Sequence, residues 1–195
     1  MIQERKGNLP ILTFDSQAAW DDWLQLNYAE TDGIWIKMSK KGTGIQTVNY
    51  DEALESALCY GWIDSQIASY DSHYYLHKFS PRRPKSKWSK INREKAEALI
   101  GAGRMQLAGL RQVELAQADG RWEAAYDSQS RIKIPEDFQY ELGQNTVASE
   151  FFATLNSINR YAILYRIQDA KTPATRARRI RKFVDMLANH RRIYP

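Results

Sequence analysis

The hydrophobic pattern of the chain changes once, at a segment in which Pro81 and Pro84 flank two arginines. Before this segment, short apolar runs with a two-residue period alternate with runs of helical spacing, and after it the pattern is helical. This order predicts an α+β fold, in which a small antiparallel or mixed sheet with packed helices is followed by an all-helical C-terminal lobe. We expect an α+β unit at residues 1–84 and a helical region at residues 85–195, or one compact domain that contains both.

The part before residue 84 carries strand and helix signals in alternation. Strands are expected at residues 10–14, 33–38, 62–67 and 74–79, the last two joined as a hairpin. Asp15 or Ser16 can cap a helix that precedes the second strand. Asn49 and Glu52 have the spacing of a capping box, which predicts a second helix that ends at Gly61.

The part after residue 84 is typical of a series of helices. Asn92 can cap the first of them, a second is expected from Leu107 to its end at Gly120, and others are expected at residues 135–143, 147–155 and 159–170. Thr172 and Pro173 have the pattern of the start of a last helix. Its apolar stripe has spacing i, i+3, i+4, i+7 and consists of Ile180, Phe183, Val184 and Leu187. The lobe therefore ends in a pair of basic helices.

The composition excludes several classes of protein. Six Trp, eleven Tyr and six Phe are too many for a disordered chain. A single cysteine, Cys59, cannot form an internal disulfide, and we expect it to be a buried, inert thiol. No apolar run approaches the roughly 20 residues of a membrane span, and the first residues lack the apolar stretch of a secretory signal. We therefore expect a cytoplasmic protein without a transmembrane segment.

The net charge of +5 conceals two basic blocks. Residues 78–104 hold nine Lys or Arg against two acidic residues, and residues 160–192 hold ten against two, so the rest of the chain carries a net charge of −10. Such a separation favours an anionic ligand, a nucleic acid or an acidic protein surface as partner. The alternative is that these charges form solvated helix faces.

Known catalytic patterns are lacking. His73 and His77 on one strand would lie roughly 13 Å apart, too far to share a metal ion. The sequence contains no nucleotide-binding glycine loop and no nucleophile elbow. Asp64 could be held in an ion pair by Arg82 or Arg83, or could serve an enclosed site. We therefore assign no catalytic residue, metal or cofactor.

The segment at residues 79–92 is the richest candidate for binding. Its prolines stiffen the backbone, its arginines and lysines can donate to phosphate or carboxylate, and a tryptophan can stack on a ligand. The candidate anion-binding residues are Arg82, Arg83, Lys87, Trp88, Ser89 and Asn92, with Asp64 nearby. A second basic patch is expected at Arg176, Arg178 and Arg179. The alternative is a structural crossover whose arginines pair with internal acids.

Several motifs identify a family resemblance. They are residues 50–54, 57–64, 79–83, 86–89, 103–105, 108–110, 119–122, 125–127 and 170–180. Over about residues 10–190 the chain resembles the bacterial YdeI/OmpD-associated family, labelled bacteriocin-protection proteins. The resemblance implies a link to resistance against bacteriocins or antimicrobial peptides and to an outer-membrane porin. It implies no catalytic residues.

The sequence thus predicts a non-catalytic bacterial protein, linked to antimicrobial and stress tolerance, that binds an anionic ligand or a protein partner through its basic segment. One alternative is sequence-independent nucleic-acid binding, with an affinity that falls steeply with salt. Another is an enzyme on a small anionic substrate, which requires Asp64, Trp88 and the arginines to line one pocket. A third is an adaptor that binds a partner protein through the C-terminal helices.

Overall fold

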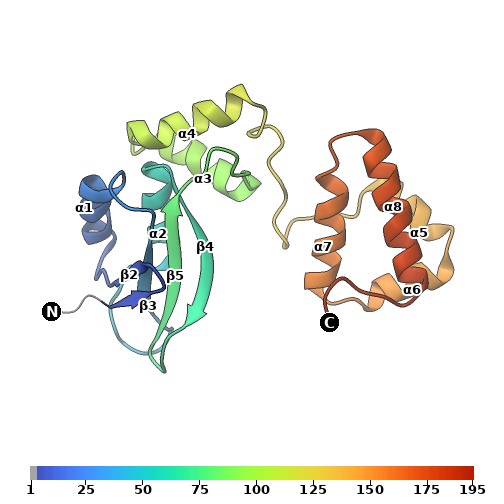
Figure 1. Ribbon diagram of the computed structural model, residues 1–195, viewed down its shortest axis with the longest axis horizontal. Helices are drawn as coiled ribbons and strands as arrows, with labels where there is room; N and C mark the ends of the chain where they lie inside the picture. Colours follow the sequence, from blue (N-terminus) through green and yellow to red (C-terminus); the bar gives the residue numbers. More distant parts are fainter. Residues whose placement is uncertain (1–3) are drawn as a thin grey trace. The chain divides into compact units, whose positions relative to one another are not determined.

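The computed structural model describes residues 4–195, and two compact units divide them (Figure 1). Unit 1 comprises residues up to 88 together with 92–124, and unit 2 comprises residues 89–91 together with 125–195. The α+β class is confirmed, with a mixed sheet in the N-terminal half and helices towards the C-terminus. Residues 92–124, which follow the proline-flanked segment, thus group with the sheet, whereas residues 89–91 group with the C-terminal helices.

The sheet of unit 1 has five strands in the order β1-β2-β3-β5-β4. The strands are β1 (Arg5–Lys6), β2 (Leu9–Leu12), β3 (Ile34–Ser39), β4 (Trp62–Ser69) and β5 (Tyr74–Pro81). β2 and β3 are parallel and the other pairs are antiparallel, so the sheet is mixed. The hairpin of β4 and β5 is confirmed, and β4 lies at an edge of the sheet. Its pairing contains a β-bulge between Asp64 and Ile67.

Two helices pack on one face of this sheet, and the first of them contributes to an aromatic core there. They are α1 (Gln17–Asn27) and α2 (Tyr50–Cys59). Trp20 of α1 is fully buried, and its ring lies 6.1 Å from those of Trp62 and Phe79. The Ser16 cap and the capping box of Asn49 with Glu52 both form as predicted, which fixes where each helix starts.

The opposite sheet face carries a smaller apolar cluster. Ile11, Trp35 and Leu76 are its buried members. The ammonium of Lys6 lies 5.4 Å from the centre of the Trp35 ring, so a cation–π contact covers this side of the cluster.

Helices α3 (Lys90–Gly101) and α4 (Leu107–Ala118) complete unit 1. The prediction that Asn92 caps α3 is wrong, since the helix already begins at Lys90 and Asn92 lies inside its first turn. α3 buries Ala96 and Leu99, as its helical spacing predicts, whereas Ile100, which the same spacing places inside, is 39% exposed.

Unit 2 contains the helices α5 (Glu136–Gly143), α6 (Thr146–Thr154), α7 (Ser157–Gln168) and α8 (Pro173–Ala188). The predicted Thr172 cap and Pro173 start of α8 are confirmed. The helix expected from residue 159 begins two residues earlier, after an Asn156 cap. Asn159 is 1% exposed, and its side-chain oxygen accepts hydrogen bonds from the backbone N–H groups of Ile193 and Tyr194. The C-terminal tail is thereby fastened to α7.

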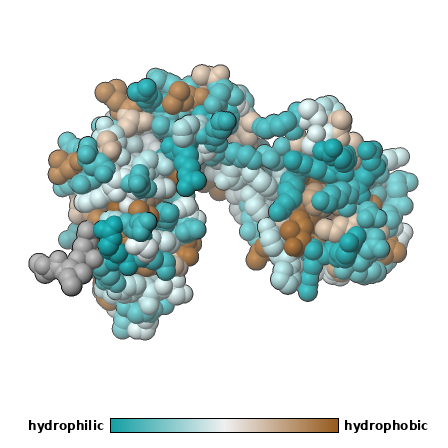
Figure 2. All heavy atoms as spheres, in the orientation of Figure 1, coloured by the Kyte–Doolittle hydropathy of each residue, from teal (hydrophilic) through white to brown (hydrophobic). Residues whose placement is uncertain are grey.

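Hydrophilic residues cover most of the visible surface of each unit, and hydrophobic residues show as separate groups (Figure 2). Among residues 4–195, no helix is both long enough and apolar enough to cross a membrane.

Candidate functional site

The proline-flanked segment lies at the end of β5, and the side chains of its first arginine and its tryptophan are buried. Arg82 is 6% exposed and Trp88 is 1% exposed. The guanidinium carbon of Arg82 lies 3.6 Å from the centre of the Trp88 ring, and its Nη1 donates to the Lys87 carbonyl at 3.3 Å. Trp88 was expected to offer a stacking face to an external ligand. Instead, this buried indole stacks with an arginine of its own chain.

The other members of the segment separate from this buried pair. Arg83 and Lys87 are exposed, whereas Ser89 and Asn92 are partly exposed. The backbone N–H of Arg83 donates to the Ser86 hydroxyl, which closes the turn that presents the arginine. Ser89 belongs to unit 2, where it forms a single bridge with Tyr126. The expected cluster is therefore split into a buried, an exposed and a peripheral part.

Asp64 lies at the start of β4, and its partners differ from those predicted. Its Oδ2 accepts a hydrogen bond from the Tyr50 hydroxyl at 3.1 Å and lies 3.4 Å from His77 Nε2. The prediction that Arg82 or Arg83 holds this carboxylate is wrong. Burial raises the pKa of Asp64, but the hydrogen bonds from His77 and Tyr50 outweigh it and hold the pKa below its ordinary value.

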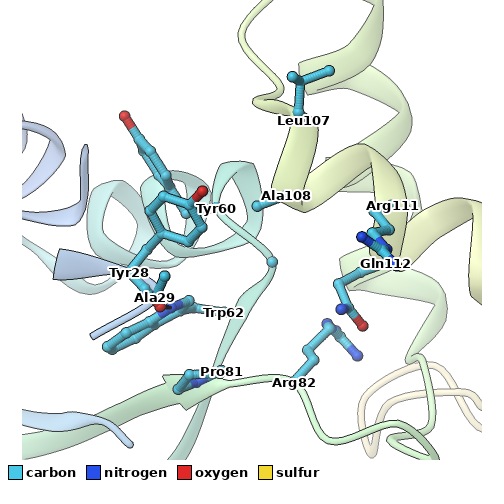
Figure 3. A pocket seen from close by; sticks show the side chains of 11 residues that line it. Tyr28, Ala29, Tyr60, Trp62, Pro81, Arg82, Leu107, Ala108, Arg111 and Gln112 are labelled. Atoms are coloured by element: carbon cyan, nitrogen blue, oxygen red, sulfur yellow. Dashed lines mark hydrogen bonds between the residues drawn. The ribbon is translucent and has the colours of Figure 1, made fainter. Parts of the chain in front are cut away.

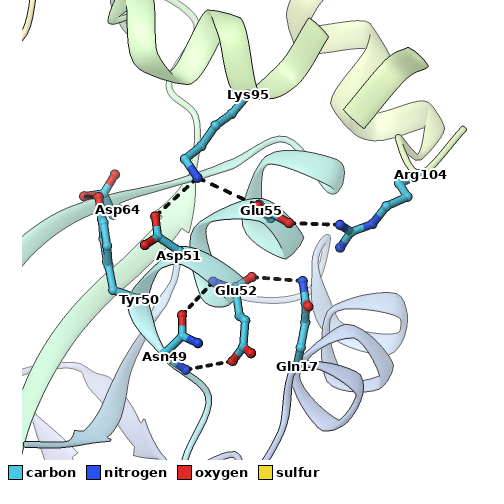
Figure 4. Close-up of polar contacts among 9 residues, drawn as sticks. All are labelled: Gln17, Asn49, Tyr50, Asp51, Glu52, Glu55, Asp64, Lys95 and Arg104. Carbon is cyan, nitrogen blue, oxygen red and sulfur yellow. Dashed lines mark hydrogen bonds and ion pairs between the residues drawn. The ribbon is translucent and has the colours of Figure 1, made fainter. Parts of the chain in front are cut away.

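Part of the first basic block neutralises acids of α2 (Figure 4). Lys95 Nζ lies 3.2 Å from Asp51 Oδ1 and 3.8 Å from Glu55 Oε1. Arg104 Nη1 donates to Glu55 Oε2 at 2.9 Å. Lys95 in the middle of α3 and Arg104 in the turn after α3 therefore hold these elements against α2, so both cations contribute to the fold.

The candidate site is a cavity of about 400 Å³ in unit 1, where α4 approaches the turn between α2 and β4. Two glycines permit this approach. A Cβ on Gly109 would lie 2.3 Å from the Cys59 carbonyl oxygen, and Gly61 has φ +74° with the Ala108 carbonyl oxygen 2.9 Å from the place of its Cβ. The backbone N–H of Gln106 donates to the Cys59 carbonyl at 3.1 Å, which joins the start of α4 to this turn.

One side of the cavity is cationic and polar. Figure 3 shows Arg82, Arg111 and Gln112 together on this side. The Arg82 backbone is held here because its N–H donates to the Gly61 carbonyl at 3.0 Å. Arg111 is exposed, and within residues 4–195 its guanidinium makes neither a hydrogen bond nor an ion pair. None of the eleven described lining residues is acidic.

The other side of the cavity is aromatic. The rings of Tyr28 and Tyr60 lie 5.7 Å apart, and Trp62 donates from its indole N–H to the Tyr28 carbonyl at 3.0 Å. Burial, with smaller contributions from Asp21 and Asp22, raises the pKa of Tyr60, so its hydroxyl stays protonated at neutral pH. The cavity contains Arg82 but neither Asp64 nor Trp88. It therefore does not assemble the set of residues that the enzymatic alternative requires.

Four of the lining residues were not predicted as site residues from the sequence: Arg111, Gln112, Tyr28 and Tyr60. The available signal was Gly109, a glycine in the first turn of the predicted helix, which indicates close backbone packing. That close contact brings the next turn of α4, with its arginine and glutamine, to the cavity.

Cys59 lies beside this cavity and is buried, as predicted. Burial raises the pKa of its thiol to about 11. The group is therefore protonated at neutral pH and is a poor nucleophile.

The second basic patch is partly used inside unit 2. Arg176 donates from Nε and Nη2 to the carboxylate of Asp137 at 2.5 and 2.8 Å, and Arg179 donates to the Arg166 carbonyl. Arg178 is exposed. A groove of about 370 Å³ runs beside Arg176 between α5 and α8, lined by Asp137, Tyr140, Glu141, Pro173, Ala177, Ile180 and Arg181 as well. The two acidic and two basic residues that line this groove cancel in net charge, so the groove does not favour an anionic ligand.

Comparisons with known proteins assign both parts of the chain. Residues 12–112 match the family described as Domain of unknown function (DUF8412), and residues 131–190 match the family described as Bacteriocin-protection, YdeI or OmpD-Associated. No curated protein and no solved structure matches the chain. The first match contains β3, β4 and β5 and all eleven described residues that line the cavity, and the second contains α5 to α8. The second match confirms the resemblance for the C-terminal part. The chain thus belongs to the DUF8412 family, and its residues 131–190 are similar to the YdeI/OmpD-associated family.

Proposed function

We propose that the chain is a non-catalytic binding protein that holds a small organic anion in the cavity of unit 1. The observation that carries the proposal is the lining of this cavity, with two guanidinium groups and an amide on one side and no acidic residue. A guanidinium presents a planar fork of N–H donors, which matches carboxylate and phosphate oxygens. Arg111 supports the proposal most directly, because its donors are not engaged by any residue from 4 to 195.

The surrounding elements fit this role. Leu107 and Ala108 form the first turn of α4 beside the cavity, where backbone N–H groups lack partners inside the helix. Such groups add partial positive charge to the two arginines. The size of the cavity lies within the range of small-molecule sites, about 300–1,000 Å³.

The test is a titration of the full chain with acetate and with inorganic phosphate at constant ionic strength. Arg111→Gln is expected to weaken anion binding about tenfold, because it removes a charge-assisted hydrogen bond. Arg83→Gln is the matched control, since Arg83 is an exposed arginine of the same unit outside the cavity. Equal affinities for wild type and Arg111→Gln would contradict the proposal. A loss in Arg83→Gln alone would move the site to the exposed turn after β5.

We propose further that this binding serves the bacteriocin protection named in the description of the matched C-terminal domain. Cells that produce Arg111→Gln at the wild-type level are then expected to survive a bacteriocin challenge as poorly as cells without the protein. Arg83→Gln cells should survive as well as wild type. Full survival of Arg111→Gln cells would separate the cavity from protection.

A further inference from the structure

The cavity of unit 1 has two chemically different sides, and this division constrains the ligand further than charge alone. Arg82, Arg111 and Gln112 lie on one side, and Tyr28, Tyr60 and Trp62 lie on the other (Figure 3). A simple inorganic anion would satisfy the first side and leave the aromatic side in contact with water. A ligand that matches both sides carries an anionic group at one end and an apolar, flat body at the other.

The aromatic side is held in place by the fold. Trp62 is 1% exposed, and its N–H bond to the Tyr28 carbonyl fixes the end of α1 against β4. The rings of Tyr28 and Tyr60 are tilted by 42° at 5.7 Å, and Tyr28 is 37% exposed. Aromatic rings in such tilted arrangements favour another ring that can pack edge to face or offset against them.

The polar side favours a planar anion. The guanidinium of Arg111 and the side-chain amide of Gln112 have no hydrogen-bond partner among residues 4–195. Both groups are planar donors, and a carboxylate can accept two parallel N–H bonds from such a fork. The lining contains neither a serine or threonine hydroxyl nor a lysine, groups that commonly complete a phosphate site.

Resting on the anion-binding function proposed above, we infer that the natural ligand is an aromatic carboxylate. Its carboxylate lies against Arg111 and Gln112, near the charge of Arg82. Its ring lies against Tyr28 and Tyr60. The hydroxyls of these tyrosines make no hydrogen bond within residues 4–195, so they can donate to a polar substituent on the ring.

The experiment compares benzoate, acetate and benzyl alcohol as probes in titrations of the full chain, followed by ligand-observed NMR. Benzoate is expected to bind about 10- to 100-fold more tightly than acetate, since its ring leaves water. Benzyl alcohol, which keeps the ring but lacks the charge, should bind at least about tenfold more weakly than benzoate. Comparable affinities for benzoate and acetate would overturn the inference.

Variants separate this inference from the function on which it rests. Tyr28→Ala should lower the affinity for benzoate about tenfold and leave that for acetate unchanged, because only the ring contacts the tyrosine. Leu26→Ala is the matched control, since Leu26 is 78% exposed at the end of the same helix and does not line the cavity. Acetate binding that depends on Arg111, without any preference for benzoate, would overturn the ligand class and leave anion binding standing. Failure of both acids to bind would overturn both proposals.

Discussion

Gly109 decides how closely α4 can approach the turn after α2, and its substitution by alanine tests how the cavity is built. A Cβ at this position would lie 2.3 Å from the Cys59 oxygen, 2.7 Å from the Leu58 oxygen and 2.9 Å from the Cys59 carbon. All three are backbone atoms, so no change of side-chain rotamer relieves the overlap. To regain the 3.0 Å that real Cβ contacts keep, α4 must move by about 0.7 Å.

Two opposing contributions set the magnitude. Overpacking of this kind costs about 3 kcal/mol at the upper end of its usual range. Alanine stabilises a helix interior by about 1 kcal/mol relative to glycine. The free energy of unfolding of unit 1 should therefore fall by about 2 kcal/mol in Gly109→Ala. The anion affinity of the cavity should fall with it, because Arg111 and Gln112 move with α4.

Tryptophan fluorescence during urea unfolding measures this change selectively. All six tryptophans of the chain lie in unit 1, so their emission follows that unit alone. Gly101→Ala is the matched control, because Gly101 is also a helical glycine of unit 1 and a Cβ there would have no neighbour within 4 Å. This control should be as stable as wild type or slightly more stable. The packing argument is refuted if Gly109→Ala has an unchanged or higher urea midpoint.

Three further predictions concern other parts of the chain. Arg82→Lys should destabilise unit 1 by about 1–2 kcal/mol in the same fluorescence assay, because an ammonium cannot stack on Trp88 as a planar guanidinium does; Arg83→Lys should change the stability by less than about 0.5 kcal/mol. Asp64 has a pKa below its ordinary value, so its contribution to stability is present above about pH 4 and is lost as the pH falls through the lowered pKa. Asp64→Asn should therefore make the stability of unit 1 less dependent on pH in that acidic range. An unchanged pH profile would contradict the stabilising role of the Asp64 carboxylate. Asn159→Ala should destabilise unit 2 by about 1–3 kcal/mol, measured by far-UV circular dichroism, because the two N–H groups of the C-terminal tail lose their acceptor; the exposed Gln139→Ala should leave the melting temperature within error.

Local signals in the sequence were sufficient for most of the secondary structure. The capping box at Asn49, the Thr172–Pro173 start of α8 and the hairpin of β4 and β5 each depend on residues close together in the chain, and each is confirmed. Asn92 shows the limit of such signals. A good capping residue does not cap a helix when the chain already enters the helix before it.

The candidate site depended on contacts between distant residues, which periodicity does not encode. Arg82 and Trp88 look like a surface recognition pair in sequence, but the indole and the guanidinium shield each other in the interior. For Asp64 the sequence offered an ion pair with the nearest arginines or a role in an enclosed site, whereas its partners Tyr50 and His77 come from α2 and from the neighbouring strand. Arg111 belongs to no sequence motif. It can be recognised as a lining residue of the cavity only once the packing of Gly109 places α4 beside Gly61.

The irregular pairing of β4 affects whether the edge strands of two copies of this protein can pair with each other. An edge strand exposes a row of backbone donors and acceptors that can recruit the same strand from another copy and start aggregation. β4 is eight residues long, and Ile67 on it is 69% exposed, so it would be a strong template if it were regular. From Asp64 to Ile67 the strand advances three residues while β5 advances two, and the extra residue breaks the spacing that an incoming strand would have to match. A regular strand from a second copy could therefore not continue its hydrogen-bond ladder along the whole length of β4.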